Sequence, residues 1–448
     1  MKIIFPIVRM NWYRVVATTI DAALAAGHEV ECWHSIGGTH WQANRPNLQK
    51  VPVFLQGKPV IREYDSDEAF LKLAAEQSPE AIVSISVPWD GIIPGLQTLT
   101  ARPRWVVIAT NDTFAKVNHR EVIEACDLIV LRSPHELRCV VDDHTADLSG
   151  LLHEMESAPD QHGELFFSLL RARQAHRWTE DMVREFESRS VATGYPLLDS
   201  ALGLDLEKIR SRWGISSHTP VVGCLASPYG TVLNVPWERA FVSNGPLARR
   251  WRNFKWRGLT GLVRQAPNET EIMDALRLFC DRNKAKLVVK LRHSQDATPT
   301  MRRVADVMLD EASYYPHTAV EMAAVSSVMF GFFTTGAPEA VAASHPFINL
   351  SIPGYNRKVW ERSASMFCGQ FDWPGVTASY PAETWVKAAG QLRLDNLKID
   401  REAWQKYAQR YCGPMDGRHS ARVMRAIELQ SSGIPLKEIP RNQEGFVC

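Results

Sequence analysis

The stretch that sets the fold is residues 2–33, KIIFPIVRMNWYRVVATTIDAALAAGHEVECW. Its apolar run over residues 2–8 predicts a buried strand, and the apolar spacing over residues 13–26 predicts an amphipathic helix. Gly27 is typical of a helix end, and residues 28–33 resemble a second strand. A strand, a helix and a further strand in this order predict a βαβ unit, which places parallel strands under a cover of helices.

The same alternation continues to residue 132 and then begins again after a linker. Residues 140–187 interrupt it with a polar, helical excursion. In the first series we expect strands at 81–86, 105–110 and 127–132 and helices at 67–77 and up to Cys126, and after the polar excursion we expect a short strand that runs into Ala192. In the second we expect a helix at 205–213, a strand at 221–225, a helix at 269–283, and strands at 285–291, 327–333 and 346–350. The fold class is therefore α/β, with two Rossmann-like, doubly wound parallel sheets.

We divide the chain into three parts: residues 1–192 as an N-terminal, acceptor-side domain, 193–400 as a nucleotide-donor domain, and 401–448 as C-terminal helices packing back across both. In such sheets ligands bind beyond the carboxyl ends of the strands. The loops at 9–12, 35–40, 88–91 and 111–114 therefore mark the functional face of the first domain.

Composition excludes several classes of protein. The chain has 448 residues, 45% of them hydrophobic, and its 51 Lys and Arg balance 50 Asp and Glu, which argues against a protein that coats nucleic acid. Its eight cysteines are scattered without a CxxC pair, as expected of reduced thiols. No signal peptide or spanning apolar segment is recognisable, so we expect a cytoplasmic protein, with the inner face of the membrane as an alternative site of action.

Several short motifs follow one another in the C-terminal half. They are residues 193–196 with Asp199, 226–229, 289–293, 321–324 leading to 334–336, and 416–420. With two α/β halves and a final helix pair over 401–429, this order resembles the glycosyltransferase-B architecture. Residues 193–430 are similar to the family of CDP-glycerol:poly(glycerophosphate) glycerophosphotransferases and related capsule and wall-polymer transferases. The resemblance implies two domains facing a cleft and a nucleotide-activated donor.

The segment TTGAPEA, residues 334–340, follows a strand and opens a helix expected over 338–344. Threonine suits an N-cap, proline suits the first turn, and Gly336 lets a ligand approach the backbone, so this helix start predicts an anion site. The resemblance implies that Thr334, Thr335 and Gly336 contact the nucleotide diphosphate and that Glu339 binds the ribose hydroxyls. Plain helix capping is the alternative reading.

Further donor-side residues follow two neighbouring strands. Lys290 and Arg292 share a strand face by alternation, and His293 lies at the loop, where the similar family has a histidine followed by proline, whereas here Ser294 follows His293. Positive or hydrogen-bonding groups here would meet the charge of a departing phosphate. Ser227 and Tyr229 follow the first strand of the second series and are either phosphate or acceptor contacts or parts of a turn.

An insertion over residues 231–266 contains the most pronounced local excess of positive charge in the sequence. Five basic residues alternate with three aromatics over residues 249–257, including Arg249, Arg250, Trp251, Arg252, Lys255 and Trp256. This composition fits an anionic membrane surface, a polyanionic or lipid-diphosphate ligand, or single-stranded nucleic acid. A packed insertion with solvated charges is the alternative.

Transfer to a hydroxyl needs a general base. Asp90, in PWDG directly after a strand, is the best-placed carboxylate, Asp112 is second, and His40 or Arg9 also belong to the expected cleft loops. The Asp-x-Asp triplet at 65–67 opens a helix, so we interpret it as capping and expect no metal and no cofactor.

We therefore expect a metal-independent transferase that moves a glycosyl or glycerophosphoryl group from a nucleotide-sugar or CDP-alcohol to a glycan or lipid-linked acceptor in bacterial surface polysaccharide synthesis. Peripheral membrane association fits this function, and a nucleic acid partner is not expected. A nucleotide-sugar 2-epimerase and a non-catalytic nucleotide- or glycan-binding protein of the same fold are the alternatives.

Overall fold

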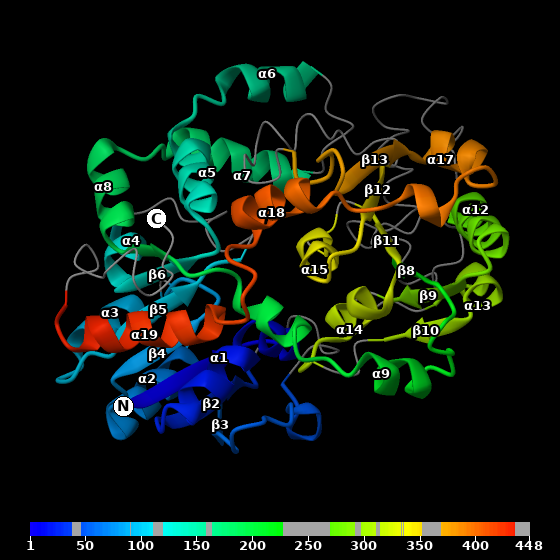
Figure 1. The fold of residues 1–448 in the computed structure, drawn as a ribbon. Helices are drawn as coiled ribbons and strands as arrows, with labels where there is room; N and C mark the ends of the chain where they lie inside the picture. The colour runs from blue at the N-terminus through cyan, green and yellow to red at the C-terminus, as the bar shows by residue number, and fades with distance from the viewer. Residues whose placement is uncertain are drawn as a thin grey trace.

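The computed structural model describes residues 1–37, 46–89, 91–110, 120–157, 164–226, 269–291, 297–310, 314–332, 334, 336–351 and 369–434. These residues form two halves that lie side by side, each built on one parallel sheet (Figure 1). The strands of the first sheet all precede residue 193, and those of the second lie between residues 221 and 381. This is the pair of doubly wound sheets that the alternation of strands and helices predicts.

The first sheet has seven parallel strands in the order β3-β2-β1-β4-β5-β6-β7. They are β1 (Lys2–Ile7), β2 (Glu29–Ser35), β3 (Val60–Tyr64), β4 (Ala81–Ser84), β5 (Arg104–Ile108), β6 (Leu128–Leu131) and β7 (Ser190–Ala192). Helix α1 (Tyr13–Ala25) connects β1 to β2, and Gly27 follows it with a φ of +77°, so the expected βαβ opening is confirmed.

Helices cover both faces of this sheet because its central strands are apolar on both sides. Helices α1 and α19 (His419–Ser431) pack on one face, as the cluster containing Phe5, Val83 and Val106 shows. The opposite face packs against α2 (Asp67–Gln77), α3 (Ile93–Thr98), α4 (Arg120–Ala125) and α8 (Glu180–Ser188). The expected polar excursion consists of α5 (Pro134–Thr145), α6 (Ser149–Ser157) and α7 (Glu164–Ala175), followed by α8.

The second sheet has six parallel strands in the order β10-β9-β8-β11-β12-β13. They are β8 (Val221–Leu225), β9 (Lys286–Lys290), β10 (Val307–Leu309), β11 (Val328–Gly331), β12 (Phe347–Ser351) and β13 (Thr377–Pro381). One face packs on α12 (Glu269–Arg282), α13 (Pro299–Val304) and α17 (Ala382–Ala388), and the other on α9 (Leu206–Arg212), α14 (Thr318–Val325) and α15 (Ala337–Ala342).

Three strands of the structure are absent from the sequence-based assignment, namely β3, β10 and β13. Each lies at or next to an edge of its sheet and is only partly buried, so its residues lack the continuous apolar pattern of a central strand. The segment after Tyr195, expected to start a helix, forms the short 3₁₀ helix η5 (Pro196–Ala201).

The linker and the C-terminal helices form a close contact between the halves. The carboxylate of Asp199 accepts hydrogen bonds from the backbone N–H groups of His419 (3.0 Å) and Ser420 (2.7 Å), which begin α19. The His419 ring lies against the backbone of the linker, with Nδ1 2.9 Å from the carbonyl oxygen of Tyr195. Two of the motifs that carry the family resemblance, 193–199 and 416–420, therefore meet and join the halves.

Helix α18 (Arg401–Tyr411) continues this contact. Its Trp404 ring N–H donates to the carbonyl oxygen of Val341 in α15, and its Arg410 carbonyl accepts from Ser133 at the start of α5. The two C-terminal helices thus touch both halves, with α19 lying against α1 (Figure 1). The boundaries 1–192, 193–400 and 401–448 remain our proposed division of the chain.

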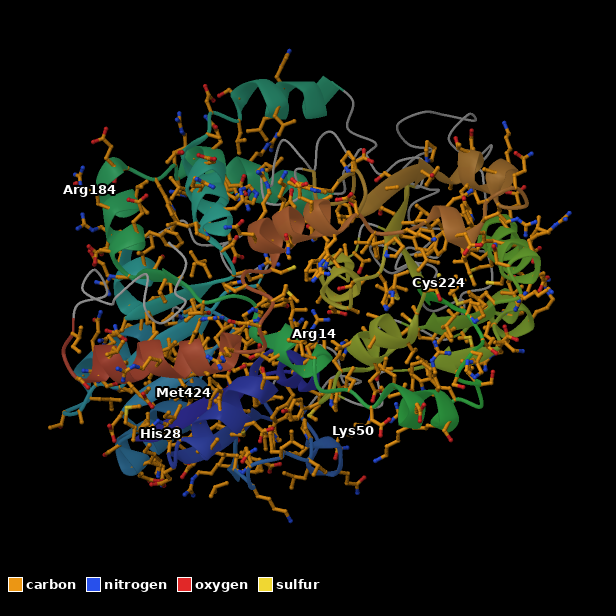
Figure 2. The ribbon with its side chains drawn as sticks, viewed as in Figure 1. Arg14, His28, Lys50, Arg184, Cys224 and Met424 are labelled. Atoms are coloured by element: carbon orange, nitrogen blue, oxygen red, sulfur yellow. The ribbon has the colours of Figure 1, made fainter. Side chains whose placement is uncertain are left out.

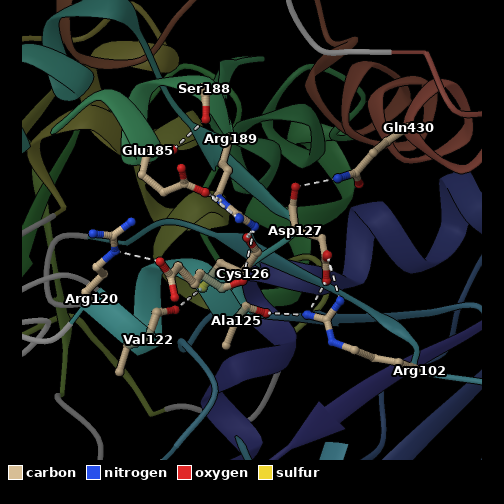
Figure 3. A network of polar contacts seen from close by, with 11 residues as sticks. Arg102, Arg120, Val122, Ala125, Cys126, Asp127, Glu185, Ser188, Arg189 and Gln430 are labelled. Carbon is tan, nitrogen blue, oxygen red and sulfur yellow. Dashed lines mark hydrogen bonds and ion pairs between the residues drawn. The ribbon is translucent and has the colours of Figure 1, made fainter. Parts of the chain in front are cut away.

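A network of charged and polar contacts lies at the amino ends of β5 and β6 in the first sheet (Figure 3). Asp127, directly before β6, accepts two hydrogen bonds from the Arg102 guanidinium at 2.9 and 3.0 Å, and Gln430 of α19 donates to its carbonyl oxygen. Arg189 donates to the carbonyl oxygen of Cys126 at 2.7 Å. Because this network lies at the amino ends of β5 and β6, it stabilises the sheet away from the face where ligands bind.

Candidate functional site

The topology of the second sheet marks one place for a ligand. Strands β8 and β11 are neighbours, and the chain leaves them toward opposite edges of the sheet, β9 and β10 on one side and β12 and β13 on the other. Ligands of doubly wound sheets bind beyond the carboxyl ends of the strands at such a point. Here those ends are Leu225 of β8 and Gly331 of β11, and α15 begins beside them.

The start of α15 differs in detail from the expected threonine cap. Gly336 occupies the N-cap position without a side-chain cap, and the helix runs over Ala337–Ala342 rather than 338–344. The half-buried Thr334 folds back instead, and its hydroxyl oxygen accepts a hydrogen bond from the backbone N–H of Gly336 at 3.3 Å. Pro338 lies in the first turn as expected, while Thr335 lies outside the described residues.

Gly336 has a structural reason to lack a side chain. A Cβ at this position would lie 2.3 Å from Cδ1 of Leu225, at the end of β8. A Cβ at Gly331 would similarly meet Phe347 at 2.7 Å and Thr334 at 2.6 Å. The two glycines therefore allow the turn after β11 to pack directly against its neighbouring strands, and the expected ligand contact of Gly336 stays a prediction.

Glu339 is the most unusual side chain of this turn. It is only 4% exposed, and its Oε2 has no hydrogen-bond partner within the described part of the chain. Glu321 offers a direct comparison, since it also lies in the first turn of a helix, α14, and is also buried, yet its Oε2 receives a hydrogen bond from Arg212 at 2.6 Å. A buried carboxylate oxygen without a partner is costly, so Glu339 is suited to a ligand that donates hydrogen bonds.

Charged side chains of both halves influence Tyr195, in the linker between the two sheets. Burial raises the pKa of Tyr195, and the carboxylate of Glu339 raises it further, whereas the guanidinium groups of Arg14 and Arg132 oppose the rise. Arg132 also lies over the Tyr195 ring, 5.3 Å from its centroid. Figure 2 shows Arg14, from the first turn of α1, where the two halves meet. Two guanidinium groups of the first half are thus within electrostatic reach of the same tyrosine as Glu339.

Arg132 forms a buried ion pair with Glu136 of α5, with 3.0 Å between Nη2 and Oε1, and its own backbone N–H donates to Oε2 at 2.6 Å. The sequence-based search overlooked both Arg14 and Arg132. It named Arg9 instead, which lies between β1 and α1 and has an exposed side chain. Their positions in the sequence could have indicated them. Arg14 lies in the first turn of the helix that follows β1, and Arg132 comes directly after β6.

Lys290 ends β9 and is buried rather than solvated, with 3% of its surface exposed. Its ammonium donates a hydrogen bond to the carbonyl oxygen of Leu291 at 3.1 Å. The other expected members of this donor group, Arg292, His293, Ser227 and Tyr229, lie outside the described residues. A shared position for these five side chains therefore stays a prediction.

The expected catalytic carboxylates Asp90 and Asp112 also lie outside the described residues, as does His40. Their neighbour Trp89 is described, and its ring N–H donates to Oδ1 of Asp67 at 2.7 Å. Ser66 caps α2 by accepting from Ala69 N–H, so the Asp-x-Asp triplet caps a helix, as predicted, and also holds Trp89 after β4.

The basic and aromatic segment 249–257 lies outside the described residues, including Arg249, Arg250, Trp251, Arg252, Lys255 and Trp256. Within the described ranges, no group of three histidine, cysteine, aspartate or glutamate side chains has the arrangement of a metal site. Among the helices that the structure describes, none combines the length and the apolar character needed to cross a bilayer.

Two parallel sheets of seven and six strands, one in each half of the chain, define the glycosyltransferase-B fold, and the expected architecture is confirmed. No family model and no curated protein matches the chain. The wall teichoic acid polymerase TagF is a similar solved structure, with a TM-score of 0.56 and 12% identity over 96% of this chain and 89% of that one.

Two UDP-N-acetylglucosamine 2-epimerases are similar to a comparable degree. The putative enzyme from Listeria monocytogenes has a TM-score of 0.51 and 10% identity, covering 97% of this chain and 98% of that one. The enzyme from Neisseria meningitidis, bound to UDP-GlcNAc, has a TM-score of 0.52 and 10% identity, covering 96% of this chain and 100% of that one. At this identity the likeness shows the fold, which transferases and epimerases share.

Proposed function

We propose that this protein is a transferase that moves a glycosyl or glycerophosphoryl group from a nucleotide-activated donor to an acceptor hydroxyl. The observation that carries the proposal is the buried, unpartnered carboxylate oxygen of Glu339 beside the β8 and β11 strand ends. A ribose hydroxyl can donate the hydrogen bond that this oxygen lacks. The similar fold of a 2-epimerase that is bound to UDP-GlcNAc supports a nucleotide-activated sugar as the class of ligand.

In the proposed reaction the acceptor oxygen forms a new bond as the donor bond to phosphate breaks. With a nucleotide-sugar, the bond forms at the sugar carbon and a nucleoside diphosphate leaves. With a CDP-alcohol, it forms at phosphorus and CMP leaves. We assign Asp90 as the base that takes the acceptor proton and Asp112 as its alternative, and we assign Lys290, Arg292 and His293 to the charge of the leaving phosphate.

Measurements of nucleotide binding test the proposed contact between the Glu339 carboxylate and the ribose. We expect CDP or UDP to raise the melting temperature of the wild-type protein, and Glu339→Gln to weaken this binding about tenfold or more, because a hydrogen bond to a charged group contributes about 1.5–3 kcal/mol. The matched control is Glu383→Gln, since Glu383 also lies in the first turn of a helix, α17, but is exposed. A 2′,3′-dideoxy nucleotide should bind wild type and Glu339→Gln equally. Stabilisation by no nucleotide would refute the proposal.

Product analysis separates the activities. A transferase releases nucleoside diphosphate or CMP only when an acceptor is present, whereas a 2-epimerase yields an epimerised sugar without one. Asp90→Asn is expected to lower kcat by about 100-fold or more, the contribution typical of a general base, while leaving the nucleotide-induced rise in melting temperature unchanged. Epimerised sugar in a reaction without acceptor would favour the epimerase instead.

A further inference from the structure

The segment that connects β2 to β3 presents an unusual surface. Of the seven large hydrophobic side chains that are exposed among the described residues, four lie within residues 48–60. These are Leu48 (58% exposed), Val53 (83%), Leu55 (78%) and Val60 (48%). Single exposed apolar side chains are ordinary, whereas a group of them on one segment marks a contact surface.

The structure holds this segment in place. The carboxylate of Asp21, in α1, accepts hydrogen bonds from the backbone N–H groups of Leu55 and Gln56, each at 2.9 Å. Phe54 is buried, and its ring centroid lies 6.1 Å from that of Tyr13 and 6.1 Å from that of Tyr315. Because Phe54 is anchored inward, its neighbours Val53 and Leu55 are directed to solvent by the alternation of an extended chain.

The charge of the segment has one sign. Residues 46–60 contain no aspartate or glutamate, and their two ionisable side chains, Lys50 and Lys58, are both exposed. Figure 2 shows Lys50 at the edge of the molecule near the place where the two halves meet. Two lysines beside four exposed aliphatic side chains are complementary to a surface that is apolar beneath a negatively charged layer.

We propose that residues 46–60 bind the surface of an anionic lipid bilayer. Val53 and Leu55 enter the boundary between headgroups and acyl chains, while Lys50 and Lys58 lie on the lipid phosphates. A protein partner fits the segment less well. The centres of protein interfaces are enriched in exposed tryptophan, tyrosine and arginine and depleted in lysine, and the one aromatic residue of this segment, Phe54, is turned inward.

The contact between Phe54 and Tyr315 places this surface where the first half meets the second. Tyr315 follows β10 at the carboxyl end of that strand, and residues 46–60 belong to the connection that runs from the carboxyl end of β2 past α1 to the amino end of β3. A bilayer bound here would lie beside the junction, which suits delivery of a lipid-linked acceptor. That last step rests on the proposed function, whereas the lipid binding itself does not.

Vesicle co-sedimentation of the full chain without nucleotide tests the proposal. Wild type should bind phosphatidylcholine vesicles that contain phosphatidylglycerol, and Val53→Asp/Leu55→Asp should bind them at least about tenfold more weakly, since two apolar groups are lost and two negative charges gained. The matched control is Leu206→Asp, because Leu206 is 43% exposed and begins α9, where a carboxylate suits the helix start.

A second variant isolates the charge. Lys50→Glu/Lys58→Glu should lose the preference for phosphatidylglycerol over pure phosphatidylcholine, and wild-type binding should weaken as salt rises. Unchanged binding by Val53→Asp/Leu55→Asp would overturn the proposal, as would no vesicle binding by wild type, or a loss of binding on neutralising residues 249–257 alone. The nucleotide-induced rise in melting temperature, measured on the same variants, should stay at the wild-type value, so a failure here is distinct from a failure of the proposed function.

Discussion

Replacing Gly194 by alanine tests the contact between the linker and the C-terminal helices. Gly194 has a φ of +91°, and a Cβ there would lie 2.1 Å from Cδ2 and 2.5 Å from Nε2 of His419. The His419 ring has little freedom to move away, since it is buried, its Nδ1 lies 2.9 Å from the Tyr195 carbonyl oxygen, and its backbone N–H donates to Asp199 at 3.0 Å. The substitution therefore adds both backbone strain and a steric clash.

Gly27 provides a control that carries only the backbone strain. Its φ is +77°, and a Cβ there would have nothing within 4 Å. A non-glycine residue in this region of φ costs about 1–2 kcal/mol. Forcing an extra methyl group into a packed site costs about 1–3 kcal/mol more. We therefore expect Gly27→Ala to lower the free energy of unfolding by about 1–2 kcal/mol and Gly194→Ala to lower it by about 2–5 kcal/mol.

Urea unfolding followed by tryptophan fluorescence measures both variants, with the free energy taken from the midpoint and the slope of the transition. Equal losses for the two variants would refute the reasoning, because they would show that His419 moves aside without cost. Gly413→Ala is an independent check, since its Cβ would lie 2.5 Å from Cα of Gly194 and 2.7 Å from the carbonyl oxygen of Arg132. It should also lose more stability than Gly27→Ala.

Three further predictions concern named contacts. Asp199→Ala removes both acceptors at the start of α19 and should cost about 1–2 kcal/mol in urea unfolding. Glu136→Gln removes the charge of the carboxylate that pairs with the buried Arg132 and should lower the free energy of unfolding by about 3 kcal/mol, measured in the same way. Burial lowers the pKa of His34 to about 4, so the unfolded chain takes up the proton first as pH falls from about 6.5 to 4. Wild type should lose about 3 kcal/mol across that window and His34→Gln less, whatever its stability at neutral pH.

The central strands and their helices were predictable from the sequence because burial on both faces leaves a continuous apolar run. Residues 2–33 predicted β1, α1 and β2 to within two residues at each end. Edge strands were not predictable in this way, because a strand such as β3 needs apolar residues on one face only. Strand β3 also contains Arg62, whose Nε donates a hydrogen bond to the buried Glu31 at 2.7 Å. That pairing joins residues far apart in the chain and leaves no periodic signal.

The part of the site that follows a buried strand was also predictable from the sequence. A turn of threonine, glycine and proline after a buried strand marked the start of α15, and Glu339 does lie in its first turn. The contribution of the first half was not readable, because Arg14 and Arg132 come from a helix and a strand end separated by more than a hundred residues. They approach Tyr195 only when the sheet is folded and the linker crosses it.

Two of the motifs on which the family resemblance rests, 193–199 and 416–420, lie at the contact between the halves rather than at the β8 and β11 strand ends. The linker is held against α19 by contacts of Gly194 and Asp199 with His419. Tyr195, which follows Gly194, is within electrostatic reach of Glu339, Arg14 and Arg132. The geometry of this contact therefore sets how far the Glu339 carboxylate of one half lies from the guanidinium groups of the other. Residue types at such a contact follow from packing and capping, so these two motifs indicate the shared fold and do not by themselves distinguish a transferase from an epimerase.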